Sequence, residues 1–109
     1  MLPVSDYTQR KQIEKRPPAD ILKLNDWLRA YAAQVNAVYA DYYRAVVDDK
    51  GFLRDGISGD GLHPDAKGYE LMAPVAEAAI RAALRYYPVL VIFLSLPTRA
   101  ARKRPGHQR

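Results

Sequence analysis

The chain has 109 residues, of which 49% are hydrophobic and 27% charged, and it contains no cysteine. This composition fits one small globular domain or part of a larger one, and it excludes a disulfide scaffold and a cysteine-ligated metal site. The longest strongly apolar run, residues 89–96, is far shorter than the roughly 20 apolar residues that a membrane-spanning helix needs. The first residues show no signal-peptide pattern, so we expect neither a membrane span nor an export signal in this chain.

The net charge of +5 is confined to one end of the sequence. Residues 1–98 contain 12 basic and 12 acidic residues, so the excess lies in five residues of the tail, namely Arg99, Arg102, Lys103, Arg104 and Arg109. Such a tail attracts anions in a salt-sensitive way that does not depend on nucleotide sequence, and no specific nucleic-acid partner is predicted. Two interpretations remain: a solvated tail on an enzyme domain, or a small basic accessory protein that binds an anionic partner through this tail.

The first third of the chain predicts a strand end, a loop and a helix. Residues 2–4 are apolar and could finish a strand, and residues 5–18 are polar without a period and predict a surface loop. A helix is predicted over residues 19–35, with Pro17 and Pro18 at its start and Asn36 as its stop signal. Its apolar positions recur at helical spacing and Trp27 should widen the buried face; they are Ile21, Leu24, Leu28, Tyr31 and Val35.

The rest of the body predicts a strand, a glycine-rich loop and a second long helix. Residues 37–42 are apolar and partly β-favouring and predict a strand that ends near Asp41, followed by a short helix over 43–48 and a turn at 49–51. Four of the six glycines lie between positions 51 and 61, so residues 53–64 predict an irregular loop. The helix over residues 65–85 contains Pro74, which should kink it or locally break its hydrogen bonds.

Residues 89–94 resemble a buried strand, although Pro97 and the basic tail follow them. An added strand, an artefact of the reading frame and an interface remain open for this segment. We therefore divide the chain into residues 1–86, the body of the domain, and residues 87–109, an apolar segment with a basic, flexible tail.

His63 is the candidate for acid–base chemistry. It lies in the glycine-rich loop three residues after Asp60, and across a turn that carboxylate can reach the imidazole Nδ1–H at about 2.6–3.2 Å. Such a contact fixes the tautomer and leaves Nε2 available as a general base. The simpler alternative is an ordinary loop histidine beside a turn-forming Asp60; the other histidine, His107, lies in the tail and is expected to be solvated.

The sequence around this pair resembles that of a known family. Residues 60–69, D-G-L-H-P-D-A-K-G-Y, closely resemble the last block of the SGNH, or GDSL-type, serine esterases and acylhydrolases. Residues 2–7, 21–28 and 38–43 are similar to the family's fourth strand, penultimate large helix and last strand. The resemblance implies an α/β fold, with residues 1–86 as the C-terminal half of a flavodoxin-like three-layer α/β/α hydrolase domain.

The resemblance also implies a chemistry. In this family His63 would be the base of a Ser-His-Asp triad that cleaves an ester or thioester, and Asp60 would orient it. Asp65 stands where the family often has Asn, and either side chain caps a helix. The family's G-D-S serine and G-x-N-D block are absent from this chain, and none of Ser5, Ser58 and Ser95 follows Gly-Asp.

We therefore expect a fragment that carries base and orienting acid, that is inactive alone, and that can associate through an exposed sheet edge. No cofactor is predicted. Four residues close in sequence match no zinc or EF-hand spacing, namely Asp55, Asp60, His63 and Asp65. The eight tyrosines, including the pair Tyr42 and Tyr43, fit packing better than a stacking surface.

Overall fold

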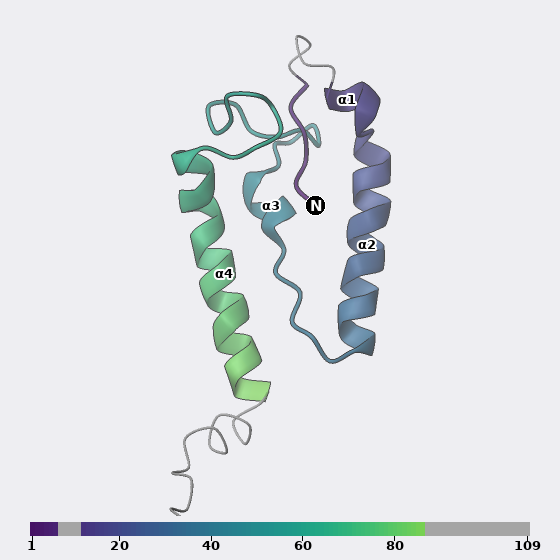
Figure 1. Ribbon diagram of the computed structural model, residues 1–109, viewed down its shortest axis with the longest axis vertical. Coiled ribbons are helices and arrows are strands. Elements are labelled where there is room, and N and C mark those ends of the chain that lie inside the picture. The colour runs from purple at the N-terminus through teal and green to yellow at the C-terminus, as the bar shows by residue number, and fades with distance from the viewer. Residues whose placement is uncertain (7–11, 87–109) are drawn as a thin grey trace, which may run out of the picture.

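The computed structural model describes residues 1–6 and 12–86, so the predicted strand at 89–94, the basic tail, His107 and Ser95 lie outside the described residues. The elements are α1 (Gln12–Lys15), α2 (Pro18–Gln34), α3 (Tyr42–Val46) and α4 (Ala66–Tyr86). The two long helices, α2 and α4, flank an irregular middle that contains α3 and the N-terminal segment (Figure 1). Across residues 1–6 and 12–86, no helix is long and apolar enough to cross a membrane.

The boundaries of the two long helices were predicted to within one residue. Pro18 occupies the first position of α2, where its missing N–H costs nothing, and Asn36 has a left-handed φ of 56° just after the helix. Helix α4 runs through Pro74 without interruption to Tyr86. The predicted loop over 5–18 was wrong in part, because the short helix α1 lies within it.

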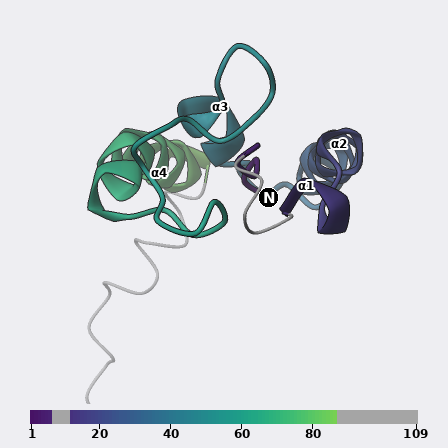
Figure 2. The same cartoon turned by 90° about the horizontal axis from the view of Figure 1, so that it is seen from above.

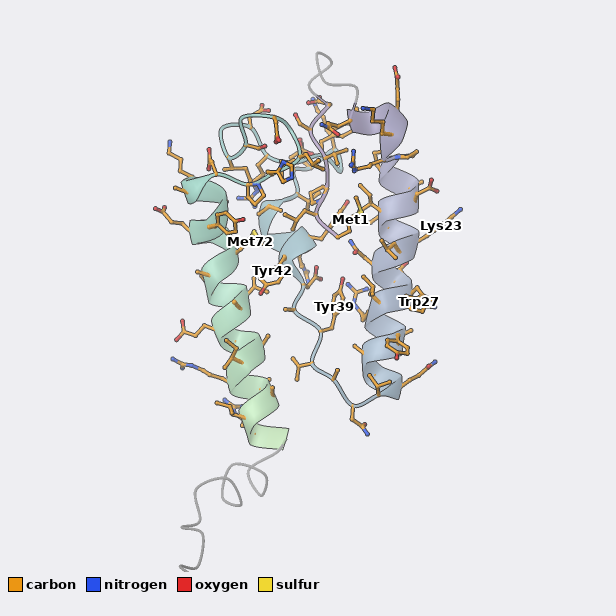
Figure 3. The ribbon with its side chains drawn as sticks, viewed as in Figure 1. Met1, Lys23, Trp27, Tyr39, Tyr42 and Met72 are labelled. Atoms are coloured by element: carbon orange, nitrogen blue, oxygen red, sulfur yellow. The ribbon has the colours of Figure 1, made fainter. Side chains whose placement is uncertain are left out.

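The predicted buried face of α2 was wrong. Ile21 is buried, but Leu24, Trp27, Tyr31 and Val35 are 42–60% exposed. Trp27 stacks on Tyr31 with ring centroids 5.3 Å apart, on the outer side of the helix (Figure 3). The physical reason is that, among the described residues, nothing packs over this face, and apolar spacing alone does not provide a covering element.

The predicted strand near residues 37–41 was also wrong. These residues run between α2 and α4 (Figures 1 and 2) but have no regular structure. The backbone N–H groups of Val38, Tyr39 and Ala40 make no hydrogen bond to any described residue. A strand is defined by pairing, and no adjacent described segment supplies the partner.

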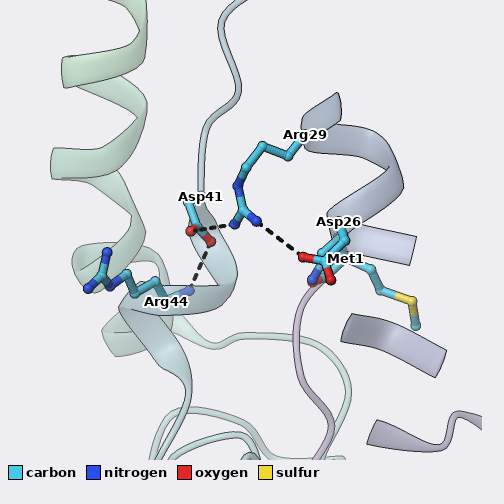
Figure 4. A network of polar contacts seen from close by, with 6 residues as sticks. Met1, Asp26, Arg29, Asp41 and Arg44 are labelled. Atoms are coloured by element: carbon cyan, nitrogen blue, oxygen red, sulfur yellow. Dashed lines mark hydrogen bonds and ion pairs between the residues drawn. The ribbon is translucent and has the colours of Figure 1, made fainter. Parts of the chain in front are cut away.

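Helix α2 nevertheless holds this segment from one side. The Arg29 guanidinium lies 5.0 Å from the Tyr39 ring and 3.2 Å from Asp41 Oδ2, and it also contacts Asp26 (Figure 4). Asp41 in turn caps α3 by accepting a hydrogen bond from the Arg44 N–H. On the side of α4, residues 38–41 line a largely apolar groove of about 590 Å³ with small residues of that helix, including Ala78, Ala79 and Ala82.

The core lies at the other end of the molecule, under the glycine-rich loop. Val46, Leu53 and Ile57 are at most 6% exposed, and Leu2, Ala45 and Met72 pack against them. The N-terminal residues do not form the predicted strand end, but they are fixed in place, because Val4 is buried and its carbonyl accepts a hydrogen bond from the Leu53 N–H at 2.9 Å. This small core joins the N-terminal segment, α3 and α4 and supports the loop that follows Leu53.

Asn25 is the one buried polar side chain of α2, and it anchors the same N-terminal segment. Its Nδ2 donates to the Met1 carbonyl at 2.8 Å, and its Oδ1 accepts from the Met1 amino group at 2.5 Å. A buried amide that satisfies both its donor and its acceptor stabilises a specific docking geometry. The long helix α2 is thereby tied to the segment beneath the loop.

Candidate active site

The loop that carries Asp60 and His63 is irregular, as predicted. It begins with a turn in which Asp48 Oδ1 accepts hydrogen bonds from the Lys50 and Phe52 N–H groups, and an isolated bridge joins Val47 to Leu53. The loop then returns to the core, where the Asp65 N–H donates to the Ile57 carbonyl at 2.8 Å. Both ends of the loop are therefore fixed to buried residues.

Two glycines, one in the loop and one in the first turn of α4, are required by close approach. Gly61 has a φ of +76°, and a Cβ there would lie 2.9 Å from Ser5 Cβ. Gly68, in the first turn of α4, would place a Cβ 2.6 Å from Pro64 Cβ and 3.0 Å from the Ile57 carbonyl oxygen. The G of D-G-L-H and the G of K-G-Y are thus the positions at which the loop packs on the N-terminal segment and on the start of α4.

Asp65 caps the helix that follows. Its Oδ1 accepts a hydrogen bond from the Gly68 N–H at 3.1 Å, which satisfies one of the unpaired donors at the start of α4. The predicted capping role is confirmed. The cap fixes where α4 begins, and with Pro64 it sets the position of His63 at the head of that helix.

The predicted contact between Asp60 and His63 is present. Asp60 Oδ2 lies 2.5 Å from His63 Nδ1, slightly closer than the expected range. The other oxygen, Oδ1, accepts hydrogen bonds from the His63 N–H at 2.8 Å, the Leu62 N–H at 2.9 Å and the Ser58 hydroxyl at 3.2 Å. The carboxylate is therefore held at both oxygens, with one of them reserved for the imidazole.

These contacts keep Asp60 ionised. The His63 side chain first, then the His63 and Leu62 backbone N–H groups, and finally Ser58 hold the pKa of the Asp60 carboxyl far below its usual value of 3.8. An ionised carboxylate can only accept hydrogen bonds, so His63 Nδ1 must be the donor. The Nε2 atom is then the acceptor of the neutral ring, and no described residue bonds to it.

His63 is open to solvent. Its side chain is 77% exposed, against 37% for Asp60. An exposed Nε2 can take up a proton from a group that approaches from outside the described residues. Beside the loop lies a pocket of about 230 Å³, lined by residues that include Ser5, Ser58 and Gly61.

No serine of the described residues is placed as an obvious nucleophile. The Ser58 hydroxyl is engaged within the loop, since it donates to Asp60 and accepts from the Gly61 N–H at 3.0 Å. Ser5 is half-buried against Gly61, and its backbone N–H donates to the Gly61 carbonyl at 2.9 Å. The sequence had not predicted the contacts of Ser58, and the only signal for them is its place two residues before Asp60.

In the part of the chain that the structure describes, no group of three or more His, Cys, Asp or Glu side chains is placed to hold a metal ion. Asp60 is committed to His63, and Asp65 to the N-terminus of α4. The chemistry available to this arrangement is proton transfer at His63.

We compared the sequence with models of known protein families. The model of the GDSL-like lipase/acylhydrolase family matches residues 2–71, which include the N-terminal segment, α2, the loop and the start of α4. No curated protein and no solved structure matches the chain. The chain belongs to the GDSL-like lipase/acylhydrolase family, a family of hydrolases, as the D-G-L-H-P block indicates.

Proposed function

We propose that this chain supplies the acid–base half of a Ser-His-Asp active site that hydrolyses ester or thioester bonds of a small acyl substrate. The observation that carries the proposal is the contact of Asp60 Oδ2 with His63 Nδ1 at the head of α4, with Nε2 exposed. Membership of a hydrolase family supports it.

His63 acts as base and then as acid. Nε2 takes the proton of a serine hydroxyl while the serine oxygen attacks the acyl carbon, and it then gives that proton to the departing alcohol or thiol. In the second half, Nε2 takes a proton from water, the hydroxide attacks the acyl-serine, and the acid product leaves as the serine regains its proton. Asp60 keeps Nδ1 protonated and stabilises the imidazolium in both halves.

The nucleophile of this mechanism comes from outside the chain. The 109 residues contain no Gly-Asp-Ser sequence, and the Ser58 hydroxyl is engaged with Asp60. We infer that residues 1–86 correspond to the C-terminal half of a three-layer α/β/α domain, and that a second polypeptide segment carries the serine and the oxyanion hole. The position of residues 37–41 between α2 and α4 supports this arrangement (Figure 2).

That segment has a place to dock. Residues 37–41 are not a strand, but the N–H groups of Val38, Tyr39 and Ala40 are unpaired, so the segment can become an edge for an added strand, and the apolar groove beside α4 offers the contacts of an interior. Addition of a strand to such an edge provides backbone hydrogen bonds and covers the groove together. The alternative function, an accessory protein that binds anions through its tail, remains a prediction about residues outside the described ranges.

The test is hydrolysis of p-nitrophenyl acetate and of a short-chain thioester by the purified chain, beside the His63→Ala variant. We expect both proteins to show the same background. Adding a polypeptide from a family member that carries the G-D-S and G-x-N-D blocks, cut before its own D-x-x-H block, should produce turnover that His63→Ala abolishes. Turnover by the chain alone that is lost in His63→Ala would contradict the proposal, because a serine of this chain would then be the nucleophile.

A further inference from the structure

Ser58 stands apart from the other groups around Asp60. The Leu62 and His63 N–H groups that bind Oδ1 belong to the backbone and would be present whatever the side chains were. Among the described residues, Ser58 and His63 are the only two whose side chains form hydrogen bonds with Asp60. It comes from the segment before Asp60, whereas the other donors follow it.

The Ser58 hydroxyl accepts one hydrogen bond and donates another. Its oxygen accepts from the Gly61 N–H at 3.0 Å, and its hydrogen is directed to Asp60 Oδ1 at 3.2 Å. A hydroxyl that accepts a hydrogen bond becomes a better donor, so the two contacts strengthen one another. The hydroxyl also closes the turn from residue 58 to residue 61.

Gly61 connects this hydroxyl to the rest of the fold. Gly61 is buried, it has a left-handed φ of +76°, and its carbonyl accepts from the Ser5 N–H at 2.9 Å. A continuous series of contacts thus leads from the N-terminal segment through Gly61 and Ser58 to Asp60. The orientation of Asp60 is thereby coupled to a segment that is 55 positions away in the sequence, a gap that runs from Ser5 to Asp60.

We propose that Ser58 is a positioning residue of the active site, which holds Oδ1 of Asp60 so that Oδ2 remains directed at His63 Nδ1. The inference rests on the proposed function, because it assigns Ser58 a role through the Asp60–His63 pair. It also removes Ser58 from the candidates for the nucleophile. Without the hydroxyl, the Gly61 N–H and one side of Oδ1 lose their partner, and the carboxylate gains freedom to rotate away from the ring.

The experiment is nitrogen NMR of the full chain, selectively labelled at histidine, at about pH 8.5, where an imidazole is mostly neutral. The tautomer of His63 is read from the chemical shifts of its two ring nitrogens. We expect the Nδ1–H tautomer to predominate in the original chain and in Ser58→Thr, which retains the hydroxyl. In Ser58→Ala we expect its fraction to fall measurably, because Oδ1 then keeps only its two backbone donors, with backbone amide spectra that still show the folded core.

The outcomes separate the two proposals. An unchanged tautomer in a folded Ser58→Ala chain would overturn the role of Ser58 and leave the Asp60–His63 pair intact. A His63 that lacks the Nδ1–H tautomer in the original chain would overturn the pair itself, and the role of Ser58 with it. Loss of the tautomer in Ser58→Thr as well, with the fold retained, would also count against the hydroxyl, because the group held responsible is still present.

Discussion

The two ends of this molecule differ in how completely they are built. At the loop end, which comprises residues 1–5 and 42–68, buried side chains and backbone hydrogen bonds fix the chain on all sides. At the helical end, which comprises α2, residues 37–41 and α4 beyond Met72, large apolar side chains are exposed and backbone donors are unpaired. The candidate site lies entirely at the loop end.

This difference shows which parts of a hydrolase domain a short sequence can form from its own contacts. The D-G-L-H-P-D block is held by close packing at Gly61 and Gly68, by the Asp65 cap and by a core of Val46, Leu53 and Ile57. These contacts come from the loop itself, from α3, from the start of α4 and, at Gly61, from Ser5. The helical end leaves large apolar side chains of α2 and α4 exposed, and no other described segment covers them. The contact between Asp60 and His63 is therefore held by the loop end, without contacts from the helical end.

Leu53→Ala should have the largest effect on stability. Leu53 is 1% exposed in the core beneath the loop, so its truncation leaves a cavity and should lower the free energy of unfolding by about 2–5 kcal/mol. Trp27→Ala is the matched change at the helical end; because Trp27 is 60% exposed, it should cost less than about 1 kcal/mol. Urea unfolding followed by circular dichroism measures both, and equal losses would remove the distinction between the two ends.

Two glycine substitutions test which position of the loop depends on close packing. Gly61→Ala combines a left-handed φ with a contact of 2.9 Å to Ser5 Cβ and should destabilise the chain by about 1–3 kcal/mol. Gly59→Ala is the control, because its Cβ meets nothing within 4 Å and its φ is not left-handed. The same unfolding assay should detect almost no change in Gly59→Ala, and a cost as large as that of Gly61→Ala would show that the contact with Ser5 is not what matters.

The cap of α4 should have a smaller effect. Asp65→Ala removes the acceptor of the Gly68 N–H and should lower stability by about 1 kcal/mol. Asp65→Asn keeps a side-chain oxygen at the same place and should cost only a fraction of that. Thermal unfolding compares the two variants, and an Asn variant as unstable as the Ala variant would mean that the charge of Asp65, and not the cap, stabilises the helix.

The smallest effect on stability should come from protonation of Asp60, and it should appear only at low pH. Folding lowers the pKa of Asp60 below its usual 3.8, so the ionised form stabilises the fold above that pH, and the benefit is lost as the pH falls further. The stability of the chain should therefore decrease below about pH 4 more steeply than that of Asp60→Asn. Unfolding midpoints between about pH 2 and 6 make the comparison, and parallel curves for the two proteins would show that Asp60 is not held in its charged form.

Local signals in the sequence predicted the helices and the site. The prolines before Ile21 and the stop at Asn36 bounded α2, and the spacing of Asp60 and His63 predicted their contact. Both depend on atoms a few residues apart, which makes them readable from sequence. The contacts of Ser58 with Asp60 and Gly61 were missed, because a hydroxyl two residues before an aspartate can point in many directions until the loop is folded.

The errors concern contacts that this part of the chain does not contain. The spacing of Leu24, Tyr31 and Val35 correctly predicted a helix, but not which of its faces is covered. The β-favouring residues 37–41 were predicted as a strand because sequence reports propensity, whereas a strand exists only with a partner. Among the described residues no segment pairs with residues 37–41, so the propensity of this segment is not realised as a strand.

Amide hydrogen exchange tests the contrast between the two ends most directly, because it reports both in one measurement on the chain as it is. We predict slow exchange at Ser5, Leu53 and Asp65, whose N–H groups donate to the Gly61, Val4 and Ile57 carbonyls. We predict exchange close to that of an unfolded peptide at Val38, Tyr39 and Ala40, and slowing there when the serine-carrying polypeptide is added. Rapid exchange at Leu53 and Asp65, or protection of residues 38–40 in the chain alone, would contradict a formed loop end beside an unpaired segment.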